Sequence, residues 1–134
     1  MDKQRYEILQ TPVDAVDMRD ALDFVAAAVS ERTTPGFILA VNPEKVFVLR
    51  EDAFLRDFFQ HACLLIPDGI GMVKALGILH GVKISRVPGA DLMQNICAEA
   101  PTRGYRIFIY GAGEEVNARA CAILEQRHPG HAPA

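Results

Sequence analysis

The feature that most constrains the fold is the alternation of short, continuous apolar runs with helix-length stretches. Residues 37–41 (FILAV) and 63–66 (CLLI) are two such runs, and residues 105–110 (YRIFIY) are the clearest strand in the sequence. An apolar run without polar alternation is typical of a strand covered on both faces. Because no hairpin signal separates these strands, the pattern predicts an α/β fold: a Rossmann-like, mostly parallel sheet with helices on both faces.

Helix-length segments lie between the apolar runs. Residues 12–32 have apolar side chains at helical spacing, with Asp14 or Asp17 placed to favour the positive end of the helix dipole. Asn42 followed by Pro43 is a favoured helix start. The helical stretch that begins there is predicted to reach about residue 61, with a break near Glu51 and Asp52, and residues 82–87 to form a short strand or an extended connection. The remaining predicted helices are residues 72–80, 92–100 and 114–128.

Composition excludes several classes of protein. The 134 residues are half hydrophobic and 23% charged, with a formal net charge of −3, which predicts one globular domain and argues against a nucleic-acid partner. The cysteines form no C-x-x-C pair and the histidines no H-x-x-x-H pair, so we expect a reducing setting and no metal site. There is no signal peptide and no run of about 18 apolar residues. We therefore expect a cytoplasmic protein or one on a membrane surface.

An apolar stretch in the predicted helical segment after Asn42 either packs in the core or forms a lipid-docking stripe. It contains two aromatic or aliphatic pairs at helical i,i+4 spacing, which favours packing in the core. Its members are Phe47, Phe54, Leu55, Phe58 and Phe59.

Three segments follow the predicted strands, and ligands bind at the carboxyl ends of strands in parallel α/β sheets. They are AVNPEK at residues 40–45, PDGIG at 67–71 and YGAG at 110–113. Asp68 is either a turn residue or a catalytic acid or base, and its place at this edge favours the second interpretation. The segment GAGEEV at residues 111–116 begins like a G-x-G-x-x-G fingerprint, but Val116 replaces the third glycine. It is weak evidence for NAD, and equally fits a diphosphate-binding loop or a tight turn.

Taken together, four segments resemble one family. VNPEKV, LIPDGIGMV, RVPGADL and FIYGAG, in this order and spacing, resemble the WecG/TagA/CpsF glycosyltransferases over about residues 6–130. The resemblance implies a Rossmann-like core and inverting transfer of a sugar from a UDP donor to a polyprenyl-diphosphate-linked acceptor. The sugar would be N-acetylmannosamine, its uronic acid or glucose, in cell-envelope or exopolysaccharide biosynthesis. It implies no cofactor and no essential metal, and places the enzyme at the inner face of the cytoplasmic membrane.

The resemblance also carries roles onto this sequence. Asp68 matches the family's catalytic base and Asn42 its active-site asparagine, whereas Ala40 stands where the family often has a threonine hydroxyl. The other matched positions are expected to bind substrate: Gly69, Gly71, Arg86, Gly89, Asp91, Gly111 and Gly113. Considered without the resemblance, Arg86 is expected either to pair with phosphate or to form a surface salt bridge.

Members of the family continue past HPG at residues 128–130, so the resemblance implies that residues 1–134 are one incomplete domain. Three functions remain open: the glycosyltransferase, a truncated non-catalytic remnant or nucleotide-binding module, and an unrelated NAD-binding Rossmann domain. An incomplete sheet would leave an exposed edge, which favours association with another chain. We therefore expect a homo-oligomer or an aggregating chain with weak UDP affinity, to be tested by light scattering.

Overall fold

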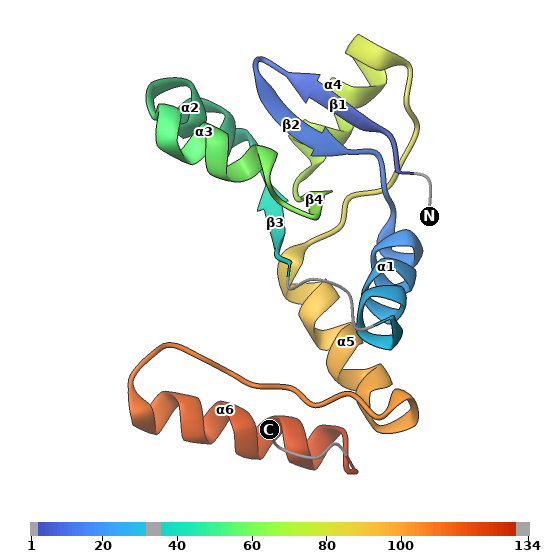
Figure 1. Cartoon of the computed structure of the whole chain (residues 1–134), viewed down its shortest axis with the longest axis vertical. Helices are drawn as coiled ribbons and strands as arrows, with labels where there is room; N and C mark the ends of the chain where they lie inside the picture. The colour runs from blue at the N-terminus through green and yellow to red at the C-terminus, as the bar shows by residue number, and fades with distance from the viewer. Residues whose placement is uncertain (1–2, 32–35, 131–134) are drawn as a thin grey trace. The chain divides into compact units, whose positions relative to one another are not determined.

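The computed structural model describes residues 3–31 and 36–130. The contacts divide the chain into two compact units, residues 1–92 and 93–134. The prediction of a single domain stays a prediction. The elements are β1 (Arg5–Ile8), β2 (Thr11–Asp14), α1 (Met18–Ser30), β3 (Ile38–Val41), α2 (Pro43–Glu51), α3 (Ala53–Gln60), β4 (Leu64–Pro67), α4 (Ile70–His80), α5 (Gly89–Arg103) and α6 (Glu114–Arg127) (Figure 1).

The first unit is an α/β structure built on a parallel pair of strands. β3 pairs with β4 from Ile38 opposite Leu64 to Val41 opposite Pro67. All four residues of β4 are buried. Both strands lie within or beside the continuous apolar runs, so the α/β class and these two strands are confirmed. The sheet is small, because each of the two sheets in the described residues has only two strands.

The N-terminal segment differs from its prediction. Residues 11–14 form β2, which pairs antiparallel with β1, so the helix predicted from residue 12 is wrong in its first turns. The hairpin turn consists of Leu9 and Gln10, which have φ angles of 49° and 67°. Turns of this kind normally use Asn and Gly, because left-handed angles are costly for other residues, so the sequence carries no recognisable hairpin signal. The pairing of the two strands holds the turn in place.

Capping side chains set where α1 and α3 begin. Asp17, not Asp14, starts α1: its side chain accepts from the Asp20 amide while Asp20 accepts from the Asp17 amide, a reciprocal capping box. The predicted break between α2 and α3 is confirmed at Asp52. Its backbone N–H donates to the Val48 carbonyl, and its carboxylate accepts from the Leu55 amide at 2.9 Å.

A buried ion pair joins the hairpin to β4. The Arg5 guanidinium donates from Nε to Asp14 Oδ1 at 2.7 Å and from Nη2 to Oδ2 at 3.0 Å. Asp14 is fully buried, and its Oδ2 also accepts from the Leu65 backbone amide at 2.8 Å. Arg5 donates further to the carbonyl of Ala62 at 2.9 Å. The bond to Asp14 raises the pKa of Arg5 above its ordinary value, so the guanidinium keeps its charge.

The hydrophobic core of the first unit lies around the hairpin and the parallel strands. Its buried members come from β1 to β4, α2 to α4 and the turn before β4: Ile8, Val13, Val41, Val46, Leu49, Phe59, Ala62, Leu65, Met72 and Leu76. The β1–β2 hairpin and α4, which both contribute to this core, lie side by side in Figure 1. The core interpretation of the aromatic stretch is therefore confirmed for Phe59 and the partly buried Leu55.

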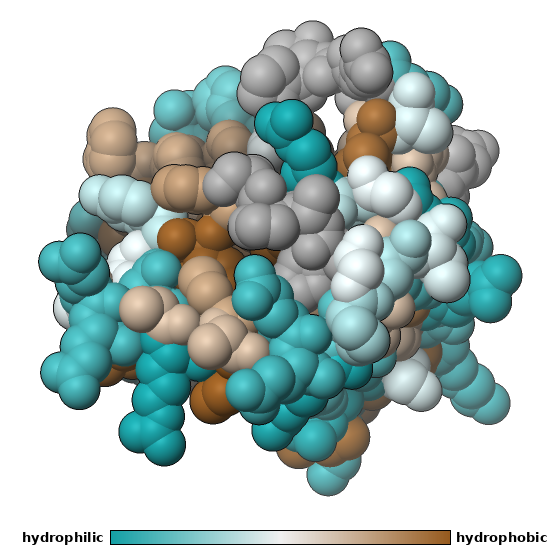
Figure 2. Space-filling model, turned by 90° about the horizontal axis from the view of Figure 1, so that it is seen from below, coloured by the Kyte–Doolittle hydropathy of each residue, from teal (hydrophilic) through white to brown (hydrophobic). Residues whose placement is uncertain are grey.

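Other hydrophobic side chains reach the surface. Phe58 stacks on Phe37 with ring centroids 4.6 Å apart but is partly exposed, and Phe47 and Phe54 are 65% and 78% exposed, so the core interpretation is wrong for these two. Hydrophobic groups lie between hydrophilic ones on the face drawn in Figure 2. No helix in residues 3–31 or 36–130 is long and apolar enough to cross a bilayer.

The second unit contains the rest of α5, an extended segment and α6. Residues 105–110 join neither sheet, and only Ile107 makes an isolated bridge, so the strand predicted there is wrong. Phe108 and Tyr110 are 73% and 93% exposed, whereas Tyr105 is buried. The segment is thus covered on alternate residues only, and an apolar pattern cannot supply the partner strand that a ladder needs.

The buried ion pair yields a stability prediction. Replacing Asp14 by Asn keeps the shape of the side chain but leaves the Arg5 charge without its partner. We expect the free energy of unfolding in urea to fall by about 3 kcal/mol. The matched control is Asp23→Asn, which breaks the exposed Arg19–Asp23 pair at 3.2 Å and should change stability by less than about 1 kcal/mol. Equal effects of the two substitutions would show that the buried pair does not hold the fold together.

Candidate active site

Two polar residues follow the parallel strands at the same end. Asn42 comes directly after β3 and Asp68 directly after β4, and both are half-buried. The Asp68 backbone N–H donates to the Val41 carbonyl at 2.8 Å, which extends the pairing beyond the end of β4. The sequence expectation that these segments share one edge therefore holds for the strands of the first unit.

The Asp68 carboxylate bonds outside its own turn. Oδ2 accepts from the backbone N–H of Gly89, the first residue of α5, at 3.2 Å. A turn aspartate would instead bond to backbone groups two or three residues away. No other hydrogen bond reaches this carboxylate from the part of the chain that the structure describes. Asp68 is thus fixed at one oxygen, while Oδ1 remains available to a ligand.

Small residues surround this carboxylate. A Cβ built on Gly89 would lie 3.6 Å from the Ala40 Cβ and 3.8 Å from Asp68 Oδ2. Ala40, Asp68 and Gly89 therefore meet at the carboxyl end of the strands. Because residue 89 has no side chain, its backbone comes close to the Ala40 methyl group and to the Asp68 carboxylate.

The starts of α2 and α4 approach each other closely. A Cβ on Gly71 would lie only 2.8 Å from Pro43 Cγ, and Gly69 has a φ of 120°, which favours glycine. Asn42 caps α2, since its Oδ1 accepts from the Lys45 amide at 2.9 Å. The start of α4 has no side-chain cap. Its first amides can therefore donate to an anion from outside the helix.

Arg86 and Asp91 lie on segments that adjoin this edge. Residues 82–87 are an extended connection, anchored where the Val87 N–H donates to the Pro67 carbonyl at 2.8 Å. Arg86 is exposed, and its guanidinium bonds to none of the described residues, so the expected salt bridge is not found among them. Asp91 is exposed in the first turn of α5.

The glycine-rich turn, residues 111–113, belongs to the second unit. Gly111 has a φ of 112° and Ala112 one of 57°, and Gly113 starts α6 without a side-chain cap. Sequence reasoning missed Asn117, whose side-chain amide donates to the carbonyls of Ile109 and Gly111 at 3.0 and 3.2 Å. An amide side chain within one turn of a glycine-rich helix start is the signal that could have indicated it.

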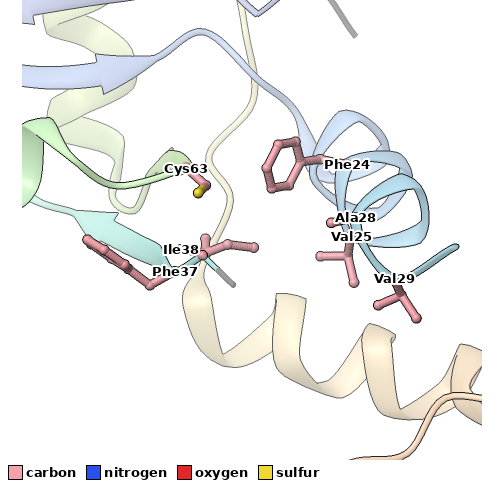
Figure 3. Close-up of a pocket in the computed structure, with 8 residues that line it drawn as sticks. Phe24, Val25, Ala28, Val29, Phe37, Ile38 and Cys63 are labelled. Carbon is pink, nitrogen blue, oxygen red and sulfur yellow. The ribbon is translucent and has the colours of Figure 1, made fainter. Parts of the chain in front are cut away.

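Two apolar hollows lie in the first unit. One borders the candidate site, because Pro43 and Gly71 line it, together with Ile8, Leu9, Val46, Phe47, Met72 and Ala75. In the other, Phe24 and Val25 of α1 face Ile38 and Cys63 at the opposite end of the strands from Asp68 (Figure 3). The described residues that line the second hollow include no acid, base or cation, so it is not a candidate for the chemistry.

Among the described residues, neither a cluster of metal ligands nor a reactive thiol is found at the candidate site. The described ranges contain no group of three His, Cys, Asp or Glu side chains that could hold a metal ion. The expectation of a reaction without a metal or other cofactor stays a prediction. Burial raises the pKa of the Cys97 thiol, which makes it a poor nucleophile.

Comparison with known protein families matches residues 6–134 to the glycosyl transferase WecG/TagA/CpsF family. The chain belongs to this family. The match extends over essentially the whole chain and confirms the resemblance seen in its motifs. Members of the family are glycosyltransferases of cell-envelope polysaccharide synthesis, which in general use a nucleotide-sugar donor and a lipid-linked acceptor. Membership argues against an unrelated NAD-binding domain.

The close approach of α2 and α4 can be tested with Gly71→Ala. The added methyl group would meet the Pro43 ring at 2.8 Å, and that ring cannot move without the start of α2. We expect a loss of about 1–2 kcal/mol in the free energy of unfolding. Gly77→Ala on the same helix is the control: its Cβ would lie 3.5 Å from the Val82 carbonyl, so it should be neutral or stabilising by up to about 1 kcal/mol. Equal stability of the two variants would contradict the close contact.

Proposed function

We propose that this chain is an inverting glycosyltransferase that transfers a sugar from a UDP donor to a polyprenyl-diphosphate-linked acceptor. The donor sugar is N-acetylmannosamine, its uronic acid or glucose. The observation that carries the proposal is the Asp68 carboxylate, which stands at the carboxyl end of β4 with one oxygen held by the Gly89 amide and the other available. The acceptor brings the enzyme to the inner face of the cytoplasmic membrane.

Asp68 acts as the general base in a single displacement. The acceptor hydroxyl oxygen attacks the anomeric carbon on the face opposite UDP, and its proton passes to Asp68 Oδ1. The bond from the anomeric carbon to the UDP oxygen breaks, and that oxygen keeps the electron pair. The Gly89 N–H fixes Oδ2, so the carboxylate does not have to be oriented during the reaction.

The leaving UDP needs positive partners. The uncapped amides at the start of α4, beside Gly69 and Gly71, suit an anion. The exposed Arg86 guanidinium is geometrically suited to pair with phosphate oxygens. Asn42 uses Oδ1 to cap α2, which leaves its Nδ2 to donate to a sugar hydroxyl. Asp91, exposed at the start of α5, would accept from another hydroxyl.

A second candidate is a nucleotide-binding module without catalysis. It is favoured by Ala40, which presents a methyl group beside Gly89 and Asp68 where the family often has a hydroxyl. The two candidates differ in turnover: both bind UDP, but only the enzyme releases it from a UDP-sugar in the presence of the acceptor.

Asp68→Asn tests the assigned base. The amide keeps the shape but does not accept the proton, so we expect the transfer rate to fall by about 100-fold or more, with UDP affinity retained. The measurement is UDP release from the three UDP-sugars with a polyprenyl-diphosphate-linked acceptor. Asp57→Asn, on the exposed face of α3, is the matched control and should keep the wild-type rate. Wild-type transfer by Asp68→Asn would remove Asp68 from the mechanism.

Ala40→Thr tests the missing hydroxyl. If the threonine hydroxyl donates one hydrogen bond to the transition state, we expect transfer to rise by about tenfold. Ala40→Val has the same shape without the hydroxyl and should give no increase. Equal rates for the two variants would mean that position 40 acts only through its size.

A further inference from the structure

The apolar hollow that Pro43 and Gly71 line, called the hairpin hollow from here on, lies wholly within the first unit. It is enclosed by the end of β1, the turn that follows it, α2 and the first turns of α4. The described residues that line it include no charged and no polar side chain. Its volume is about 230 Å³, which exceeds the roughly 150 Å³ of an apolar cavity that holds benzene. The hairpin hollow therefore has room for a short, branched hydrocarbon segment.

This hollow is continuous with the candidate site. Pro43 directly follows Asn42, and its ring lies 3.6 Å from a Cβ built on Gly69, the residue after Asp68. The same ring meets a Cβ built on Gly71 at 2.8 Å and lines the hairpin hollow. One proline ring thus adjoins both the residues that follow β4 and the apolar lining. A ligand with a polar head and an apolar chain can contact the two regions together.

Leu9 borders the hairpin hollow from a strained position. It has a φ of 49° and Gln10 one of 67°, angles that Asn and Gly adopt at low cost in a two-residue hairpin turn. Leu9 is also 61% exposed, so the turn places an apolar side chain in water. Strain and exposure both cost stability at this one residue. Strained residues of this kind cluster at sites that hold a ligand.

A second exposed side chain borders the hairpin hollow from α2. Phe47 is 65% exposed, whereas Ile8 and Met72, which also line the hollow, are buried in the core. The hollow thus has a buried apolar floor, and the large apolar side chains at its rim are open to water. An apolar occupant would remove Leu9 and Phe47 from water, which favours binding.

We propose that the hairpin hollow binds the part of the acceptor's polyprenyl chain that lies nearest to the diphosphate. This inference rests on the proposed function, in which the acceptor presents a sugar hydroxyl to Asp68. Beyond its diphosphate the acceptor is an uncharged, branched hydrocarbon, which matches a lining without polar groups. The gain from covering Leu9 and Phe47 is available only to an acceptor that carries the lipid. The hollow therefore selects lipid-linked acceptors over the same sugar without a lipid.

The experiment titrates the whole chain with farnesyl diphosphate, a short analogue of polyprenyl diphosphate, and follows binding by calorimetry and by the methyl resonances of Leu9 and Met72. We expect binding that shifts both resonances, and no such shifts with inorganic diphosphate. Phe47→Ser removes one side of the rim and should weaken the binding of farnesyl diphosphate at least about tenfold. Phe54→Ser is the matched control and should bind as the wild type does, because Phe54 is 78% exposed and does not line the hollow.

Leu9→Asn separates binding from folding. Asn suits the left-handed turn position and removes the apolar side chain. We therefore expect the melting temperature to stay the same or rise, while the affinity for farnesyl diphosphate falls. A residue that served only to hold the hairpin together would show the opposite, with a lower melting temperature and unchanged affinity.

Wild-type affinity in the folded Phe47→Ser and Leu9→Asn variants would overturn the inference, as would shifts confined to residues outside the hollow. Light scattering tests for a second copy of the chain as the occupant. If Phe47→Ser dissociates an oligomer and farnesyl diphosphate does not bind, the inference is wrong. Phosphatidylglycerol vesicles test for a general membrane surface: if Phe47→Ser and Phe54→Ser weaken vesicle binding equally and neither affects farnesyl diphosphate, the inference is again wrong.

Transfer assays distinguish this failure from that of the proposed function. If Asp68→Asn abolishes transfer while Phe47→Ser and Leu9→Asn keep the wild-type KM for the polyprenyl-linked acceptor, the glycosyltransferase stands and the lipid subsite falls. If Asp68→Asn transfers at the wild-type rate while both rim variants lose farnesyl diphosphate, the lipid subsite stands and the assigned base falls.

Discussion

The fully buried carboxylate of Asp14 ties together the parts of the first unit. It accepts from Arg5 in the neighbouring strand and from the backbone amide of Leu65 in β4. A buried charge is tolerated only when it is paired and its oxygens are hydrogen-bonded, and both conditions are met here. Asp68 follows Leu65 by three residues. The contact that fixes the hairpin against β4 therefore also fixes the strand that carries the proposed base.

At the carboxyl end of that strand, small residues allow three helix starts to approach. Gly71 lies against the ring of Pro43 at the start of α2, and Gly89 brings the start of α5 to Asp68. A methyl group at Gly71 would push the starts of α2 and α4 apart, whereas one at Gly89 would make only ordinary van der Waals contacts. The result is a carboxylate held by one backbone N–H, that of Gly89, close in sequence to the uncapped start of α4, which suits a reaction that removes a proton and releases a diphosphate.

Local signals in the sequence predicted the features that depend on local physics. The apolar runs predicted β3 and β4, and capping chemistry predicted the helix start at Asn42. Because the two strands are parallel, the segments that follow them were expected at the same edge of the sheet. The hairpin was missed because Leu9 and Gln10 adopt left-handed angles that only strand pairing maintains. Residues 105–110 were assigned to a strand because an apolar pattern carries no information about a partner. Asn117 was missed because its contacts lie six and eight residues back.

The central claim is that Asp68 deprotonates the acceptor in a single displacement at the anomeric carbon. The most direct test is the anomeric configuration of the first product, measured by one-bond carbon–hydrogen coupling in NMR after transfer from an α-linked UDP-sugar. A single displacement predicts a β-linked product. An α-linked product would require two displacements or front-face attack, and would contradict a mechanism in which this carboxylate serves only as a base.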